Sequence, residues 1–167
     1  MLNGAEWYQL HENFPSTADR LLARIDECLA HLELIDTDAD AIDCIYGCLA
    51  NLHEEATEAG VAGISLHCLH LLRLLRMAQI AGSFGMSLLP SLRQCLDLLA
   101  WQVELINPRS GQLLLDDSEQ LELLEQLAIN AGLTEVEHRR VTEPRWHYSQ
   151  LLAKSFTAGL AIQRKAG

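Results

Sequence analysis

The sequence predicts an all-α protein, an antiparallel four-helix bundle with additional C-terminal helices. The first observation is composition: 49% of the 167 residues are apolar, only 5% are aromatic, and leucine and alanine, which favour helices, are abundant. The second is spacing, because apolar residues recur at intervals of three and four through most of the chain. The third is punctuation: glycine, proline and acidic clusters separate the periodic segments by short links, as antiparallel neighbours require.

The first two helices are predicted on either side of an acidic break. The first follows Pro15, with Ser16 and Asp19 spaced as in a capping box. It ends at the acidic stretch 36–40, which offers N-cap side chains to the second helix, and Gly60 interrupts that helix in turn. Their apolar stripes contain Leu21, Leu22, Ile25, Cys28, Leu29 and Leu32, and then Ile42, Ile45, Cys48, Leu49 and Leu52.

The third and fourth helices are predicted between Gly60 and residue 111. The turn 82–85 separates them, and Pro90 lies in the first turn of the fourth helix, where its missing N–H costs no hydrogen bond. Residues 107–111, Asn-Pro-Arg-Ser-Gly, end that helix. The stripes contain Ile64, Cys68, Leu71, Leu72 and Leu75, and then Leu92, Cys95, Leu96, Leu99, Val103 and Ile106.

Two further helices are predicted, one starting near Asp117 and ending at Asn130, and one after Pro144. We therefore expect a four-helix bundle at residues 16–106 and a C-terminal helical extension at 107–167 that packs on the bundle. One side of the last helix would complete the core or contact a second copy of the chain, which leaves a homo-oligomer possible. That side carries Tyr148, Leu151, Leu152, Phe156 and Leu160.

Charge and cysteine usage limit the compartment and the partners. A net charge of −11 argues against nucleic-acid binding, which needs a basic surface. No apolar stretch reaches the roughly 20 residues that cross a bilayer, and the N-terminus lacks the pattern of a signal peptide, so we expect no membrane insertion. The five cysteines lie inside helical patterns, as in reduced cytoplasmic proteins. We therefore expect a cytoplasmic protein.

The charge is divided unevenly along the chain. Residues 1–137 carry 6 basic and 22 acidic residues, whereas residues 138–167 carry 6 basic residues and 1 acidic residue. The simplest interpretation is that the basic C-terminal segment docks on the acidic body, and the alternative is a tail that binds a partner.

Residues 45–54 and 60–64 carry a resemblance to a known family. The first stretch, I-Y-G-C-L-A-N-L-H-E, matches the apolar pattern of a family helix that is written roughly I-F-R-A-A-H-S-I-K-G. The second stretch begins at Gly60, ten residues beyond Ala50, where the family has G-F-x-x-L. Residues 16–106 thus resemble a histidine-phosphotransfer domain of the type found at the N-terminus of chemotaxis kinases. The resemblance implies a four-helix bundle that meets response-regulator receiver domains or signalling kinases.

Four positions depart from the family pattern. Ala50 replaces the histidine that accepts the phosphoryl group, His53 replaces a lysine, and Glu54 replaces a glycine. The acidic residue that would orient the imidazole falls near Leu72. Because alanine has no nucleophile and Glu54 would repel phosphate, the sequence predicts no phosphotransfer, no catalytic residue and no enzyme activity.

The resulting hypothesis is a non-catalytic interaction or adaptor protein in bacterial two-component or chemosensory signalling. The face around the acceptor position would bind a receiver domain, a kinase or a scaffold protein, and it comprises Ala50, Asn51, His53, Glu54, Thr57 and Glu58. Two alternatives stay open. One is active phosphotransfer through His53, otherwise interpreted as a solvated surface histidine, and the other is a structural or oligomerising helical domain.

Metal and cofactor chemistry is weakly indicated. Cys44 and Cys48, like His67 and His70, are spaced to share a side of a helix, but any apolar stripe produces this spacing. Residues 53–57, His-Glu-Glu-Ala-Thr, lack the second histidine of a zinc-protease helix. We expect neither a metal nor a cofactor.

Overall fold

The computed structural model of the chain describes residues 6–134, which form helices joined by short links. Their bounds are α1 Glu6–Leu10, α2 Asn13–Leu34, α3 Ala39–Glu58, α4 Ala62–Ile80, α5 Leu89–Glu104 and α6 Ser118–Asn130. Extended pairing in residues 6–134 is limited to an isolated bridge between Ile106 and Leu113, so this range contains no sheet. The prediction of an all-α fold is confirmed.

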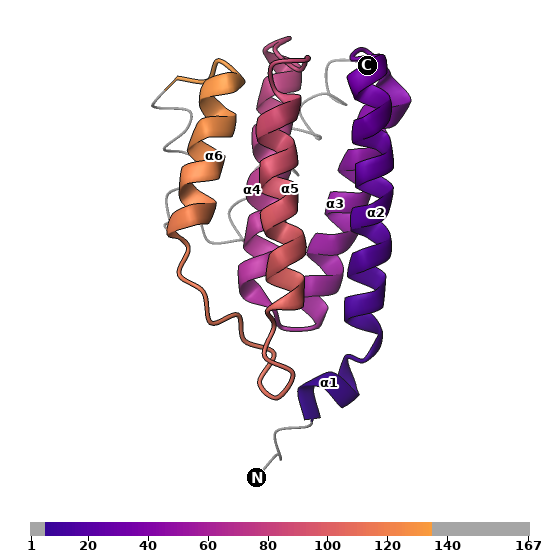
Figure 1. Cartoon of the computed structure of the whole chain (residues 1–167), viewed down its shortest axis with the longest axis vertical. Coiled ribbons are helices and arrows are strands. Elements are labelled where there is room, and N and C mark those ends of the chain that lie inside the picture. Colours follow the sequence, from indigo (N-terminus) through magenta and orange to yellow (C-terminus); the bar gives the residue numbers. More distant parts are fainter. Residues whose placement is uncertain (1–5, 135–167) are drawn as a thin grey trace, which may run out of the picture.

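Helices α2 to α5 close a four-helix bundle (Figure 1). Both α2 and α4 pack against α3 and α5, so the four helices form a ring, and short links make successive helices antiparallel. Helix α6 packs outside this ring against α4 and α5. It lies within the extension predicted at 107–167, of which residues 107–134 are described. Residues 135–167, with the helix predicted after Pro144, lie outside the described residues.

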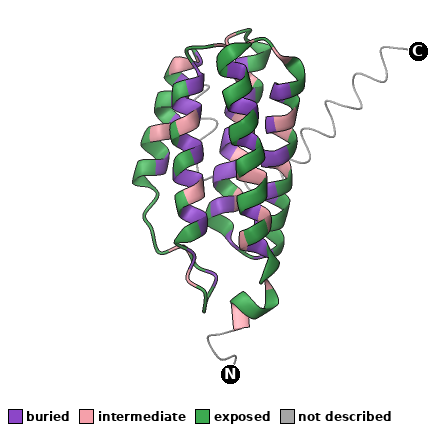
Figure 2. Ribbon diagram, turned by 45° about the vertical axis from the view of Figure 1, so that its right-hand side comes forward, coloured by how far each residue is buried: buried purple, intermediate pink, exposed green. Residues whose placement is uncertain are grey.

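The apolar stripes of the bundle helices face inward and form the core (Figure 2). Among the apolar residues predicted for these stripes, Leu21, Leu22 and Leu72 are only partly buried, and the others are buried. Burying each leucine or isoleucine side chain stabilises the folded state by about 1.5–3 kcal/mol. Between Glu6 and Asn130, no helix combines the length and the apolar run that crossing a membrane requires.

Two helix starts agree with their sequence signals. Asp38 caps α3: its carboxylate accepts hydrogen bonds from the backbone N–H groups of Asp40 and Ala41 at 2.9 and 3.1 Å. The Ala41 N–H and the neighbouring His31 lower the pKa of Asp38, because both favour its charged form. Pro90 lies in the first turn of α5, as predicted.

The start of α2 differs from the prediction. The helix begins at Asn13 and contains Pro15 in its first turn, where a residue without an N–H is tolerated. Ser16 does not cap the helix, because its hydroxyl donates to the carbonyl of Asn13 at 3.0 Å. The predicted capping box at Ser16 and Asp19 was therefore wrong.

The short helix α1, which the sequence did not predict, is attached to two distant links. The indole N–H of Trp7 donates to the carbonyl of Ala59 at 2.7 Å, and the backbone N–H of Tyr8 donates to the carbonyl of Pro108 at 3.2 Å. Gly111 lies directly against the indole of Trp7. Helix α1 thus ties the α3–α4 link to the segment between α5 and α6.

Replacing Gly111 by alanine is expected to destabilise the protein more than replacing Gly60 by alanine. Both glycines have a left-handed backbone, with φ of +68° and +74°, which costs alanine about 1 kcal/mol at each position. A Cβ at Gly60 meets nothing within 4 Å, but a Cβ at Gly111 would lie 2.2 Å from Nε1 of Trp7. The indole must then move, at a further cost of about 1–3 kcal/mol. Urea unfolding of both variants measures the difference, and equal losses would contradict the packing of Trp7 on Gly111.

Candidate interaction site

Five of the six residues predicted for the interaction face form a strip along α3. Asn51, Glu54, Thr57 and Glu58 are exposed, and Ala50 is partly buried. Their spacing places them on one side of the helix. These five residues are hereafter the α3 strip, and both of its ionisable groups are carboxylates.

The sixth residue, His53, is buried, so the interpretation as a solvated surface histidine was wrong. His53 is 7% exposed to solvent. Its Nδ1 lies 2.9 Å from the carbonyl oxygen of Ser65 and 3.0 Å from the Ser65 hydroxyl. His53 is buried because α3 packs against α4. This packing brings Ser65, in the first turn of α4, next to the imidazole.

Thr57 completes a small polar network with His53 and Ser65. Its hydroxyl donates to the carbonyl of His53 at 2.7 Å and lies 2.7 Å from the Ser65 hydroxyl. Since a carbonyl oxygen only accepts, the contact between His53 and the Ser65 carbonyl assigns a proton to Nδ1. Sequence reasoning missed Ser65. Its signal was a polar residue just beyond the Gly60 turn, where an antiparallel partner helix begins.

A groove runs between α3 and α4 beside the α3 strip. One end is a hollow of about 440 Å³ lined by His53, Thr57, Gly60, Ala62, Ser65, Leu66 and Leu69. The other end is a hollow of about 390 Å³ lined by Tyr46, Leu72, Arg73, Arg76 and Met77. Tyr46, His53 and Thr57 share one side of α3 by their spacing, and Leu69 and Arg76 share one side of α4. The two hollows therefore lie in line along the contact between α3 and α4, and together they are hereafter called the α3–α4 groove.

The α3–α4 groove combines apolar walls with charged ends. Leu66 is 49% exposed, and Leu69 and Leu72 are partly buried. Arg73 and Arg76 lie at the Tyr46 end, whereas Glu54 and Glu58 of the α3 strip are next to the His53 end. Burial raises the pKa of Tyr46 to about 12 and keeps its hydroxyl neutral.

None of the five residues of the α3 strip carries an imidazole. Ala50 ends in a methyl group, and Leu72, at the position of the orienting acid, is apolar and partly buried. The carboxylates of Glu54 and Glu58 repel a phosphoryl anion. The α3 strip is therefore an acidic surface without a histidine.

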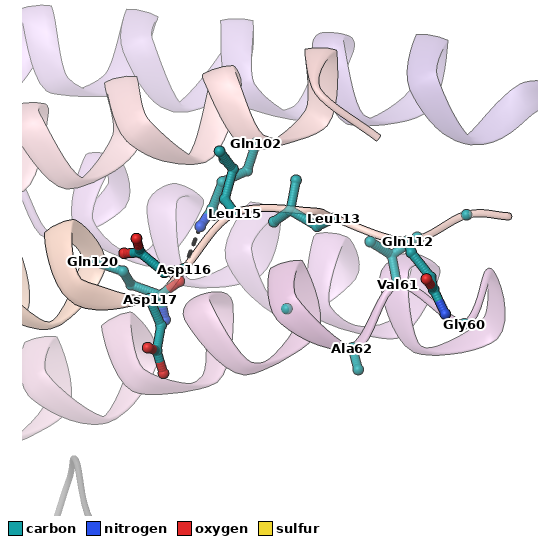
Figure 3. Close-up of a pocket in the computed structure, with 12 residues that line it drawn as sticks. Gly60, Val61, Ala62, Gln102, Gln112, Leu113, Leu115, Asp116, Asp117 and Gln120 are labelled. Carbon is teal, nitrogen blue, oxygen red and sulfur yellow. Dashed lines mark hydrogen bonds between the residues drawn. The ribbon is translucent and has the colours of Figure 1, made fainter. Parts of the chain in front are cut away.

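A third hollow, of about 370 Å³, lies beside α4 between the α3–α4 link and α6 (Figure 3). Its buried end holds a hydrogen-bonded chain across three helices: His67 Nδ1 lies 2.8 Å from Gln102 Oε1, and Gln102 Nε2 donates to Gln120 Oε1 at 2.9 Å. Figure 3 shows the two amides side by side at that end. Because these amides are occupied with each other and with His67, this chain serves to hold α6 on the bundle.

The pairs with metal-ligand spacing do not assemble into a metal site. Within residues 6–134, no cluster of three or more histidine, cysteine, aspartate or glutamate side chains is placed to hold an ion. His67 and His70 are buried, and burial lowers the pKa of each imidazole to about 4. Cys44 and Cys48 are free thiols.

No protein-family model, curated protein or solved structure matches this chain.

The free energy of unfolding is expected to fall between pH 7 and pH 4. The pKa of His67 and of His70 is about 4 in the folded protein against 6.5 for an exposed imidazole, so the unfolded chain takes up protons first as the pH drops. Above pH 6.5 both imidazoles are neutral in the folded and the unfolded chain, and they impose no cost on folding. Between pH 6.5 and about pH 4, each histidine lowers the free energy of unfolding by up to about 3 kcal/mol.

The variant His67→Gln isolates one of the two contributions. Glutamine retains an amide N–H that can donate to Gln102 but does not titrate. Urea unfolding at pH 7, 6, 5 and 4 should show a loss of stability that is smaller in the variant by about 3 kcal/mol. Identical pH dependence in both proteins would contradict the buried, neutral state of His67.

Proposed function

We propose that this chain is a non-catalytic interaction module of bacterial two-component or chemosensory signalling, which binds a response-regulator receiver domain through the α3 strip. The observation that carries the proposal is an exposed acidic strip that begins at the acceptor position of a phosphotransfer-like hairpin and contains no histidine. The protein acts as an adaptor or a competitor: it binds the receiver and passes on no phosphate.

The hairpin geometry supports the relationship to phosphotransfer domains. In that family a glycine and an apolar residue open the helix that partners the acceptor helix. Here Gly60 has φ +74° between α3 and α4, and Val61 is buried directly after it. The turn thus stands at the distance from Ala50 that the resemblance requires.

The burial of His53 supports a non-catalytic role. An acceptor imidazole has to reach the aspartyl phosphate of a receiver, so one ring nitrogen must be open to the partner surface. His53 is 7% exposed, and its Nδ1 contacts Ser65. The residues nearest to it on the α3 strip, Glu54 and Thr57, supply no positive charge to offset a phosphoryl group.

Phosphotransfer provides the first test of this proposal. The chain is incubated with phosphorylated receiver domains, and acid-labile phosphate on the chain is measured. We expect none in the wild-type protein or in His53→Gln. Acid-labile phosphate that is present in the wild type and absent from His53→Gln would establish the alternative, an active phosphotransfer site.

Charge reversal tests the α3 strip as the binding surface. A panel of receiver domains is screened against the wild-type chain, and the Kd of a bound receiver is then measured for the double variant Glu54→Arg, Glu58→Arg. We expect binding at least about tenfold weaker, because two attractive charges become repulsive. The matched control is Glu122→Arg, Glu125→Arg, which makes the same change of net charge on the exposed side of α6.

Two outcomes would contradict the proposal. Equal Kd values for the two double variants would remove the α3 strip as the binding surface. Failure of every receiver to bind, together with a stable dimer in light scattering, would instead favour the oligomerising domain.

A further inference from the structure

The α3–α4 groove remains open in the described structure although its walls are apolar. Leu66, Leu69 and Leu72 all lie along it without full burial, and Leu66 is 49% exposed. Its two hollows measure about 440 and 390 Å³. Apolar grooves between two helices commonly bind an amphipathic helix through its apolar side.

The described chain ends at the same end of the bundle as the Tyr46 hollow of this groove. The hydroxyl of Ser83, in the link after α4, donates to the carbonyl of Ala131 at 2.6 Å. The end of α6 therefore lies at the same end of the bundle as the last turn of α4, which carries Arg76 and Met77 of the Tyr46 hollow. Residues 135–167 follow the end of α6 and therefore start from the end of the bundle that carries the Tyr46 hollow.

The sequence of that segment fits the groove in length. Tyr148, Leu151 and Phe156, with Leu152 and Leu160, share one side of a helix by their spacing. A helix from Tyr148 to Leu160 would be about 18 Å long, and the groove wall from Tyr46 to Thr57 measures about 16 Å at 1.5 Å per residue.

The charges also match. Residues 138–167 contain 6 basic residues and 1 acidic residue, Glu143. A helix lying parallel to α3 would bring Glu143 toward Arg73 and Arg76 at one end. The same helix would bring Lys154 toward Glu54 and Glu58 at the other, since eleven residues, about 16 Å, separate Glu143 from Lys154.

We propose that residues 144–160 dock as an amphipathic helix in the α3–α4 groove of the same chain. The apolar side covers Leu66, Leu69 and Leu72, and Lys154 pairs with Glu54 or Glu58. The docked segment lies against the edge of the α3 strip and competes with a partner for it. The docking is independent of the proposed function, whereas this competition rests on it.

The chain contains two lysines, Lys154 and Lys165, which makes the contact easy to identify. A carbodiimide joins a lysine amine to a carboxylate in direct contact, with loss of water, and peptide mass spectrometry finds the bond. In the full chain at low concentration, we expect an amide between Lys154 and Glu54 or Glu58. In a mixture of ¹⁴N- and ¹⁵N-labelled chains, the two peptides joined by the cross-link should carry the same nitrogen isotope, because both come from one chain.

Two variants of the full chain control the assignment. Leu66→Asp changes a half-exposed side chain, so the bundle is expected to fold, and the yield of the cross-link should fall about tenfold, the factor that corresponds to about 1.4 kcal/mol. Leu121→Asp, on the exposed side of α6, should leave the yield unchanged. Circular dichroism verifies that both variants are folded.

Three results would overturn the proposal. They are a Lys154 cross-link to carboxylates of α6 or α2, no cross-link in a folded chain, and a product that mixes isotopes and so joins two copies. None of them affects the test of receiver binding, so failure of this proposal and failure of the proposed function are distinguishable.

Discussion

The reversal of the chain between α3 and α4 fixes most of the contacts on which this structure depends. Gly60 adopts a left-handed conformation, its N–H donates to Thr57, and the N–H of Val61 donates to Ala56 at 2.8 Å. This pair of hydrogen bonds is the Schellman arrangement, which satisfies carbonyls at the end of α3 within a three-residue link. The same short link brings Ser65 opposite His53 and leaves the Ala59 carbonyl available to Trp7. The register of the hairpin, the burial of His53 and the attachment of α1 thus follow from one turn.

Helix ends were predictable from the sequence where the stabilising contacts are local. Gly60, Gly82 and Gly132 all end helices with positive φ, and Asp38 and Pro90 act within one turn of their own positions. These effects need only a few neighbouring residues, so a sequence pattern contains them. The core of the bundle was predictable for the same reason. An apolar stripe at helical spacing is buried in the folded protein regardless of which element packs against it.

Features that depend on contacts between distant residues were not predictable. Helix α1 is attached through Trp7 to Ala59, fifty-two residues further along the chain, and no local signal indicates this contact. His53 occupies a position on α3 that is exposed or buried according to what α4 places beside it. The glutamines 102 and 120 show the same limit, since an amide in an apolar stripe is stable only when another helix supplies its partner. The acidic residues of the α3 strip could be named from the sequence because they are local to one helix. Which of their neighbours are exposed depends on how α4 packs against α3.

The proposed function requires that phosphotransfer chemistry can be lost while a binding surface is retained, and the two are physically separable. Transfer needs one ring nitrogen at bonding distance from a phosphoryl group and nearby positive charge, and Ala50 and Glu54 remove both requirements. Docking needs shape and complementary charge spread over several hundred Å² per partner, to which one methyl group makes little difference. Under the proposed function no phosphate has to be accommodated, so the carboxylates of Glu54 and Glu58 carry no penalty and select a basic partner surface.

In the proposed docking of residues 144–160, the same carboxylates meet a segment from the basic part of the chain, residues 138–167. A segment tethered beside the groove acts at an effective concentration of the order of millimolar, because its linker is short. A receiver present at micromolar concentration has to bind the α3 strip considerably more tightly than the tethered segment does before it displaces that segment. Under the two proposals, the affinity measured for a partner is therefore set by the difference between two contacts with the same acidic residues. It can be tuned by residues such as Lys154 and Phe156, which the partner need not touch.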